Sequence, residues 1–186
     1  MFPAATLFLD VCVQRELWIG GSWPLVGAEA AQNVLRLLEI AGPSAVRRGR
    51  VLCRHGPDGY VAAAGAPVHG LDQEAGVLPD GAPPIAVGGE VVESGCGMAP
   101  DQGAHAGSFL RMTSGIRDAV VFGAGIEHGI AHVAAALLRR RIRTHLAIDA
   151  SGTADEVAAQ VVVGALKRRG ADVATVDVIA RLLRRP

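Results

Sequence analysis

Aromatic residues are scarce in this sequence, and several common features are missing. Only 4% of the 186 residues are aromatic while 50% are hydrophobic, so the core must consist mainly of Ala, Val, Leu and Ile. Eighteen basic residues balance eighteen acidic ones, which argues against a nucleic-acid partner. No apolar run reaches the ~20 residues that a membrane-spanning helix needs. The length is typical of one globular domain, and we expect residues 1–186 to form a single domain.

Cysteine is also rare, and the three cysteines do not form a recognisable framework. Cys12, Cys53 and Cys96 are odd in number and far apart, which does not suggest a set of disulfides. The first five residues lack the basic region of a signal peptide and lead directly into a strand pattern. We therefore expect a cytoplasmic protein with neither a membrane nor a nucleic acid as partner.

Short apolar runs alternate with amphipathic ones, which is typical of βαβ units and a parallel sheet. We expect a doubly wound α/β fold with a mostly parallel six-stranded sheet flanked by helices. The predicted strands cover residues 6–10, 50–53, 90–93, 120–122, 144–148 and 172–176. Residues 84–87 compete with 90–93 for the third strand, and we favour the second of these runs.

The helices follow from apolar residues that recur at helical spacing. Residues 28–41 place Ala31, Val34, Leu35, Leu38 and Ala41 on one face, and a Gly-Pro pair follows. The other predicted helices cover residues 130–141, 155–169 and 178–183. Residues 56–89 have no helical period and are rich in Gly, Ala and Pro, so we interpret them as long loops of the kind that often carry function.

The most informative motif is the run Gly-Ala-Gly-Ile-Glu-His-Gly-Ile at residues 123–130. It follows a buried-strand pattern and opens a helix. A glycine-rich turn at such a junction directs backbone N–H groups to one spot, with the helix dipole behind them, which suits an anion or a developing oxyanion. We therefore predict a ligand-binding turn that involves Ala124, Gly125, His128 and Gly129.

This run resembles the catalytic turn of the isochorismatase-like superfamily, which includes nicotinamidases and related cysteine hydrolases. That turn has the approximate pattern G-[VA]-x-[TA]-[DE]-x-C-V. Two more segments are similar to the superfamily in the same order: the strand 7–11, which holds Asp10, and the turn Asp149-Ala150-Ser151-Gly152. The resemblance implies a Rossmann-type α/β fold with ligands at the carboxyl ends of the strands.

The resemblance also implies roles for particular residues. Asp10 matches the catalytic carboxylate of the superfamily, whereas Gly129 stands where the cysteine hydrolases have their nucleophile. True isochorismatases also have glycine at this position and hydrolyse a vinyl ether without a covalent intermediate. The resemblance therefore leaves acid-catalysed hydrolysis through Asp10 as the expected chemistry.

The lysine of the superfamily has no counterpart, because the only lysine is Lys167 in a C-terminal helix. The position expected for the superfamily lysine carries Glu93 or Ser94 in this sequence. A carboxylate from Glu93 would raise the pKa of a neighbouring Asp10 by like-charge repulsion, which would suit a second catalytic carboxylate. Three residues remain as alternatives for a substitute cation, namely Arg54, Arg111 and His105.

Two histidines are candidate metal ligands. His55 and His69 are similar in place to segments that bind metal in nicotinamidases, and Asp58 or a cysteine would complete the coordination. Close ligand spacing is absent from this part of the sequence, so our first expectation is no cofactor, with a divalent metal as the alternative.

Two functions remain open after the sequence has been read. The first is a hydrolase that acts on a small molecule by a non-covalent mechanism dependent on Asp10. The second is a catalytically inactive member of the superfamily that serves as a ligand-binding or oligomeric subunit. The apolar run 130–138 would suit a homodimer or homotetramer contact, although burial against its own sheet would explain it equally well.

Overall fold

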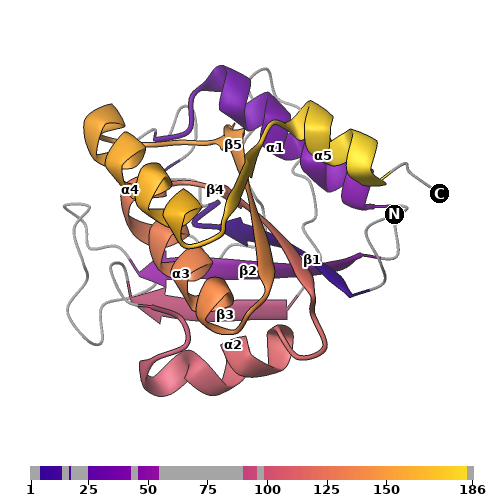
Figure 1. Ribbon diagram of the computed structural model, residues 1–186, viewed down its shortest axis with the longest axis vertical. Helices are drawn as coiled ribbons and strands as arrows, with labels where there is room; N and C mark the ends of the chain where they lie inside the picture. The colour runs from indigo at the N-terminus through magenta and orange to yellow at the C-terminus, as the bar shows by residue number, and fades with distance from the viewer. Residues whose placement is uncertain are drawn as a thin grey trace.

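The computed structural model describes residues 5–13, 17, 25–42, 46–54, 90–95 and 99–183. Within these residues it contains one six-stranded sheet with the strand order β3-β2-β1-β4-β5-β6, and every adjacent pair is parallel. Figure 1 shows this sheet with helices packed on it. The doubly wound α/β fold predicted from the sequence is confirmed.

The strands are β1 (Thr6–Val11), β2 (Arg47–Arg54), β3 (Glu90–Gly95), β4 (Asp118–Gly123), β5 (Arg143–Ser151) and β6 (Asp172–Ala174). Every residue of the central strands β1 and β4 is buried, as expected for parallel strands covered on both faces. The third strand is the favoured run, and the competing residues 84–87 lie outside the described residues. The predicted start of the second strand was three residues too late.

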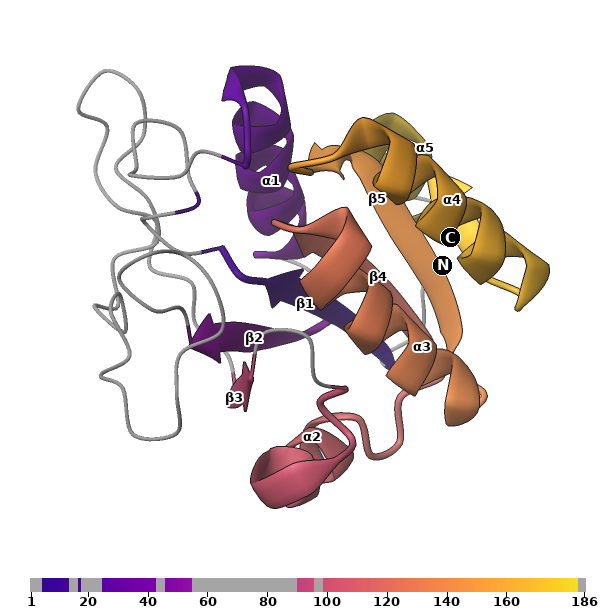
Figure 2. The same cartoon turned by 90° about the vertical axis from the view of Figure 1, so that its left-hand side faces the viewer.

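The helices form two layers around the sheet (Figure 2). α1 (Ala28–Ala41) and α5 (Val176–Leu183) lie together on one face, and α2 (Ala106–Met112), α3 (Ala131–Arg139) and α4 (Glu156–Arg168) cover the other. Two short turns, η3 (Gly103–His105) and η4 (Ile126–Ile130), precede α2 and α3. None of the helices in the described ranges combines the length and apolar character that a membrane crossing requires.

Helix α1 has the bounds that the sequence predicted. Its buried face consists of Ala31, Val34, Leu37, Leu38 and Ala41. Leu37 is buried where we had expected Leu35, which is only partly covered. The buried face is therefore rotated slightly toward Leu37, and α5 packs beside α1 on the same face of the sheet.

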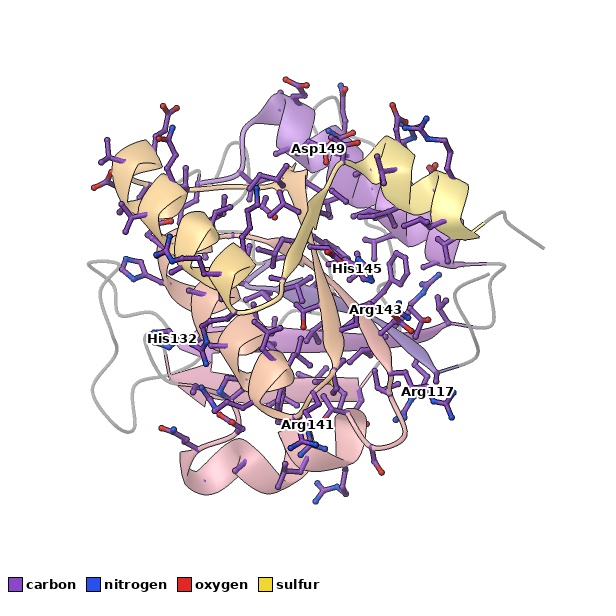
Figure 3. All side chains as sticks on the ribbon, viewed as in Figure 1. Arg117, His132, Arg141, Arg143, His145 and Asp149 are labelled. Atoms are coloured by element: carbon purple, nitrogen blue, oxygen red, sulfur yellow. The ribbon has the colours of Figure 1, made fainter. Side chains whose placement is uncertain are left out.

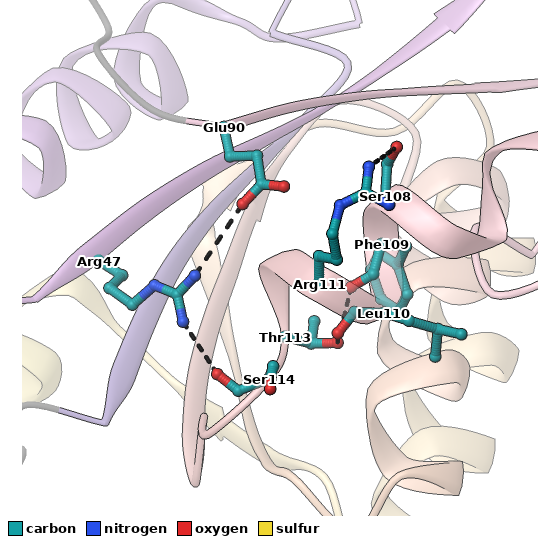
Figure 4. Close-up of polar contacts among 8 residues, drawn as sticks. All are labelled: Arg47, Glu90, Ser108, Phe109, Leu110, Arg111, Thr113 and Ser114. Carbon is teal, nitrogen blue, oxygen red and sulfur yellow. Dashed lines mark hydrogen bonds and ion pairs between the residues drawn. The ribbon is translucent and has the colours of Figure 1, made fainter.

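Helix α2 was not predicted, and tertiary contacts hold it in place (Figure 4). Phe109 and Met112 are fully buried. The hydroxyl of Thr113 donates to the carbonyl of Phe109 at 2.7 Å, and Arg47 of β2 donates to the carbonyl of Ser114 at 2.9 Å. Seven residues are too few for a stable isolated helix, so packing rather than local preference forms α2.

The amino ends of β4, β5 and β6 are joined by a polar cluster opposite the carboxyl edge of the sheet. Asp118 is buried and accepts a hydrogen bond from Nε of Arg143. His145 lies between two carboxylates, with Nε2 3.6 Å from Asp118 and Nδ1 3.4 Å from Asp172. Figure 3 shows Arg143 and His145 together on β5. These contacts tie three neighbouring strands together.

Candidate functional site

The strand order reverses between β1 and β4, and the candidate residues lie at the carboxyl ends of these two strands. β1 connects to β2 on one side of the sheet, whereas β4 connects to β5 on the other. Asp10 is the penultimate residue of β1, and Val11 pairs with Gly123 at the end of β4. Ligands of doubly wound folds bind at this kind of switch point.

Gly123 brings the two strand ends into close contact. Its φ of 127° lies in a region that side chains rarely adopt, and a Cβ at this position would clash with the carbonyl oxygen of Val11. The next residue, Ala124, donates its backbone N–H to that same carbonyl at 2.9 Å. The N–H of Ala124 is therefore used within the fold, so the predicted binding turn must rely on later residues.

The turn itself is a single π-helical turn rather than the start of a regular helix. Gly125 adopts the left-handed conformation with φ 72°, and its carbonyl accepts hydrogen bonds from the N–H groups of His128 and Ile130 at 3.1 Å each. π-helical turns of this kind often occur at functional sites. The side chain of His128 is exposed, whereas Gly129 is buried.

The surroundings of Gly129 leave little room for a side chain. A Cβ at this position would lie 3.0 Å from Cγ1 of Val11 and 3.2 Å from Sγ of Cys12. Cys12 is not in a disulfide, is 3% exposed, and has a left-handed φ of 52° directly after β1. The thiol of Cys12 thus borders the space that a side chain at position 129 would occupy.

The loop after β5 supports the turn from the other side. Ile126 donates to the carbonyl of Gly152 at 3.0 Å, and Gly152 donates to the carbonyl of Gly123 at 2.8 Å. A Cβ at Gly152 would clash with the backbone of Leu25. The segment Asp149-Ala150-Ser151-Gly152, singled out in the sequence, therefore contacts the predicted turn directly.

The carboxylate of Glu127 stabilises the contact between the turn and the loop after β5. It accepts hydrogen bonds from the hydroxyl of Thr153 at 2.7 Å and from the N–H of Ala154 at 2.8 Å. Burial by itself raises the pKa of Glu127, but hydrogen bonds from its own N–H, Thr153 and Ala154, with the charge of His128, lower the pKa overall. Glu127 is thus ionised and holds the turn in position.

Asp149 and His132 are two other polar residues near this region (Figure 3). The carboxylate of Asp149 accepts from the N–H of Val176 at 2.9 Å, and its carbonyl accepts from the amide of Asn33 at 2.9 Å, so it joins β5 to both α5 and α1. His132 on α3 is partly buried, and burial, followed by the charges of His128 and Arg139, lowers its pKa.

Asp10 is the most perturbed carboxyl group of the site. It is 1% exposed, and burial raises its pKa from 3.8 to about 6 against the opposing effect of Arg50. Nε of Arg50 lies 3.3 Å from Oδ1 of Asp10. The sequence led us to expect a raised pKa through repulsion from Glu93. Among the described residues its cause is burial, and the side chain of Glu93 lies outside them.

Arg50 is the residue that sequence reasoning missed. It pairs with Asp10 across the β1–β2 ladder and is 7% exposed. Because we expected the second strand to begin at Arg50, we treated this arginine as a strand terminus. Arg111, one of the cations considered from sequence, is instead exposed on α2 and donates to Ser108. The side chains of Arg54 and His105 lie outside the described residues.

Asp10 and the glycine turn approach the end of β1 from opposite faces of the sheet. Side chains alternate along a strand, so Val11, which borders Gly129, and Asp10 point to different faces. Phe8 and its edge-to-face partner Phe122 share the face of Asp10. A ligand that contacts both Asp10 and the turn must therefore lie over the carboxyl edge of β1 and β4.

The remaining predicted residues lie partly or wholly outside the described residues. Glu93 lies on β3, paired with Leu52, and β2 separates it from β1. Its side chain is outside the described part of the structure, as are the metal candidates His55, Asp58 and His69. The described residues contain no group of three or more potential metal ligands.

Comparison with solved structures identifies the fold of this chain. No family model and no curated protein matches the sequence. Among solved structures, an isochorismatase-like hydrolase from Alkaliphilus metalliredigens has a TM-score of 0.68 at 13% identity and covers 95% of this chain and 98% of its own. The chain has the isochorismatase-like fold.

Two other structures share this isochorismatase-like fold. The pyrazinamidase of Pyrococcus horikoshii, solved in complex with zinc, has a TM-score of 0.66 at 15% identity, with coverage of 92% of this chain and 99% of that one. The YcaC gene product of Escherichia coli, an octameric hydrolase of unknown specificity, has a TM-score of 0.68 at 18% identity, with coverage of 98% and 81%. At these low identities, the structural similarity establishes the fold alone.

Proposed function

We propose that this protein is a hydrolase of small molecules in which Asp10 acts as the general acid and base. The observation that carries the proposal is the buried Asp10 at the switch point of an isochorismatase-like fold, with a pKa of about 6. A carboxyl group that titrates near neutral pH can both donate and accept a proton during a reaction cycle.

The proposed mechanism is non-covalent because position 129 has no side chain. Protonated Asp10 donates its proton to the substrate, for example to the alkene carbon of a vinyl ether. Water then adds to the electrophilic carbon and loses a proton to the Asp10 carboxylate, which gives a hemiketal. Asp10 returns this proton to the leaving oxygen as the carbon–oxygen bond breaks, and it takes up the hydroxyl proton as the carbonyl forms, so the products are a ketone and an alcohol and Asp10 is again protonated. In this proposal the backbone N–H groups of Gly125 and Gly129 hold the negatively charged part of the substrate, and Glu93 is a second carboxylate of the site.

Metal binding is a separate prediction. The relative from Pyrococcus horikoshii was solved with zinc, and imidazole and carboxylate groups such as those of His55, His69 and Asp58 suit zinc or iron. Elemental analysis of the purified protein tests it: about one equivalent of metal, lost on substitution of His55 and His69 together, supports a metal site. Absence of zinc, iron and manganese after purification without chelators would contradict it.

Self-association is also proposed, as a homodimer or homotetramer. The YcaC gene product is octameric. Within α3, which we considered as a contact, Val133, Ala134, Ala136 and Leu137 are buried in the chain itself, whereas Ala135 and Leu138 are partly exposed. The exposed apolar side chains Val157 and Val161 instead lie one turn apart on α4. Light scattering on the purified protein gives the mass in solution, and a monomer at all concentrations would contradict this proposal.

The test of the mechanism is a panel of amides, esters and vinyl ethers assayed with the wild type, Asp10→Asn and Cys12→Ala. We expect turnover of at least one substrate class, loss of turnover in Asp10→Asn, and retention in Cys12→Ala. Alkylation with iodoacetamide should leave most of the activity. Inactivation that parallels labelling of Cys12 would show that this thiol, beside Gly129, is the nucleophile. Absence of turnover across the panel would favour the inactive binding subunit.

A further inference from the structure

We propose that Arg50 is the positioning cation of this site, the charge that holds the carboxylate of Asp10 in its ionised form and fixes its orientation. This inference rests on the proposed function of Asp10 and identifies the group that takes the place of the absent lysine. In a doubly wound sheet any of several strands could supply such a charge. Here it comes from β2, the strand next to Asp10.

The geometry of the pair supports this role. Arg50 and Asp10 are register partners on adjacent parallel strands, so their side chains leave the same face of the sheet. Both are more than nine-tenths buried, and Nε of Arg50 lies 3.3 Å from Oδ1 of Asp10. The strand on the other side of β1 offers only the apolar Phe122 opposite Asp10. Among the described neighbours, Arg50 is therefore the charge that acts on Asp10.

A second hydrogen bond fixes the guanidinium group. Nη2 of Arg50 donates to the carbonyl of Val13 at 3.3 Å, in the segment that leaves β1 after Cys12. The planar guanidinium thus spans from the carboxylate to the backbone beyond the strand end. A lysine ammonium is a single point charge on a flexible chain and would not hold both contacts in one geometry.

The balance of effects explains why such a cation is needed. Burial disfavours the charged form of a carboxyl group, and an opposite charge within about 4–6 Å favours it again by roughly one to three pKa units. Without Arg50, the pKa of Asp10 would lie at or above neutral pH, so half or more of the Asp10 carboxyl groups would be protonated and unable to accept a proton from water. With Arg50 present, both protonation states are accessible.

The experiment is an NMR titration of carboxyl-labelled aspartate, with Asp10 assigned by its loss in Asp10→Asn. We expect the pKa of Asp10 to rise by about one unit or more in Arg50→Gln and by less in Arg50→Lys. The matched control is Arg47→Gln, because Arg47 lies on the same strand but is paired with Glu90 at 3.9 Å. This control should leave the Asp10 titration unchanged. An unchanged or lowered pKa of Asp10 in Arg50→Gln overturns the inference.

The titration also separates this inference from the proposed function. If no substrate is turned over but Arg50→Gln raises the pKa of Asp10, the pairing is correct and the hydrolase proposal fails. Where activity is found, the pH above which it is lost should move to a higher value in Arg50→Gln together with the NMR value, because protonated Asp10 starts the reaction. Should Arg50→Gln fail to fold, Arg50→Met supplies the test, because it also removes the charge, and an Asp10 pKa equal to that of the wild type overturns the inference.

Discussion

Replacing Asp10 by asparagine should change how the stability of this protein depends on pH. Burial raises the pKa of Asp10 from 3.8 to about 6, so the folded state prefers the protonated form. The resulting stability is fully present below pH 3.8 and is lost as the pH rises through 6. At 1.36 kcal/mol per unit, the loss is about 3 kcal/mol above pH 7. Asparagine cannot ionise, so Asp10→Asn lacks this loss.

The measurement is the free energy of unfolding by urea for wild type and Asp10→Asn at pH 5 and pH 8. The wild type has already lost part of this stability at pH 5. The free energy of unfolding of Asp10→Asn, taken relative to that of wild type, should therefore increase by about 1.4 kcal/mol from pH 5 to pH 8. Other titrating groups are common to both proteins, and the cost of leaving Arg50 without its carboxylate is the same at both pH values. Asp155→Asn, on the surface, is the control. A relative stability that stays constant or falls toward pH 8 would refute the account of Asp10.

Three further substitutions test how the turn is built. Gly152→Ala should destabilise the protein by about 3 kcal/mol or more in thermal melts, because the new Cβ would clash with the backbone of Leu25. Gly27→Ala is the control: position 27 has open space, so this change should alter the stability by only a few tenths of a kcal/mol. Glu127→Ala should cost about 2 kcal/mol at pH 7 by removing two hydrogen bonds. The cost should fall as acid takes the pH through the lowered pKa of Glu127 and protonates the wild-type carboxylate, and a cost that stays constant in acid would contradict its ionised role. Gly129→Ala should be tolerated at a cost of about 1 kcal/mol, since Val11 and Cys12 must move by only a few tenths of an ångström.

The parts of the fold that depend on local patterns could be predicted from the sequence. The α1 helix was predicted with its observed bounds because its apolar spacing and terminal Gly-Pro pair are local signals. The central strands were predicted as continuous apolar runs, which both buried faces of a parallel sheet require. Helix α2 was missed because its stability comes from Phe109 and Met112 in the core rather than from its seven residues.

The features of the site that depend on pairing between distant segments could not be predicted. Arg50 became the partner of Asp10 only through the register of β1 and β2, and a strand that begins three residues earlier moves it from an end to the interior. In the same way, the need for glycine at position 152 arises from Leu25, more than 120 residues earlier in the chain. The sequence identified Gly152 as part of a motif without indicating what it contacts.

The most direct test of the proposed function is the rate of hydrolysis by wild type and Asp10→Asn on a vinyl ether substrate as a function of pH. The account predicts that turnover depends on a group with a pKa of about 6 in the wild type. It also predicts that Asp10→Asn, although folded, loses at least about a hundredfold in kcat because the amide can neither donate nor accept the proton. Turnover in Asp10→Asn at a rate close to that of wild type would contradict the central role given to Asp10.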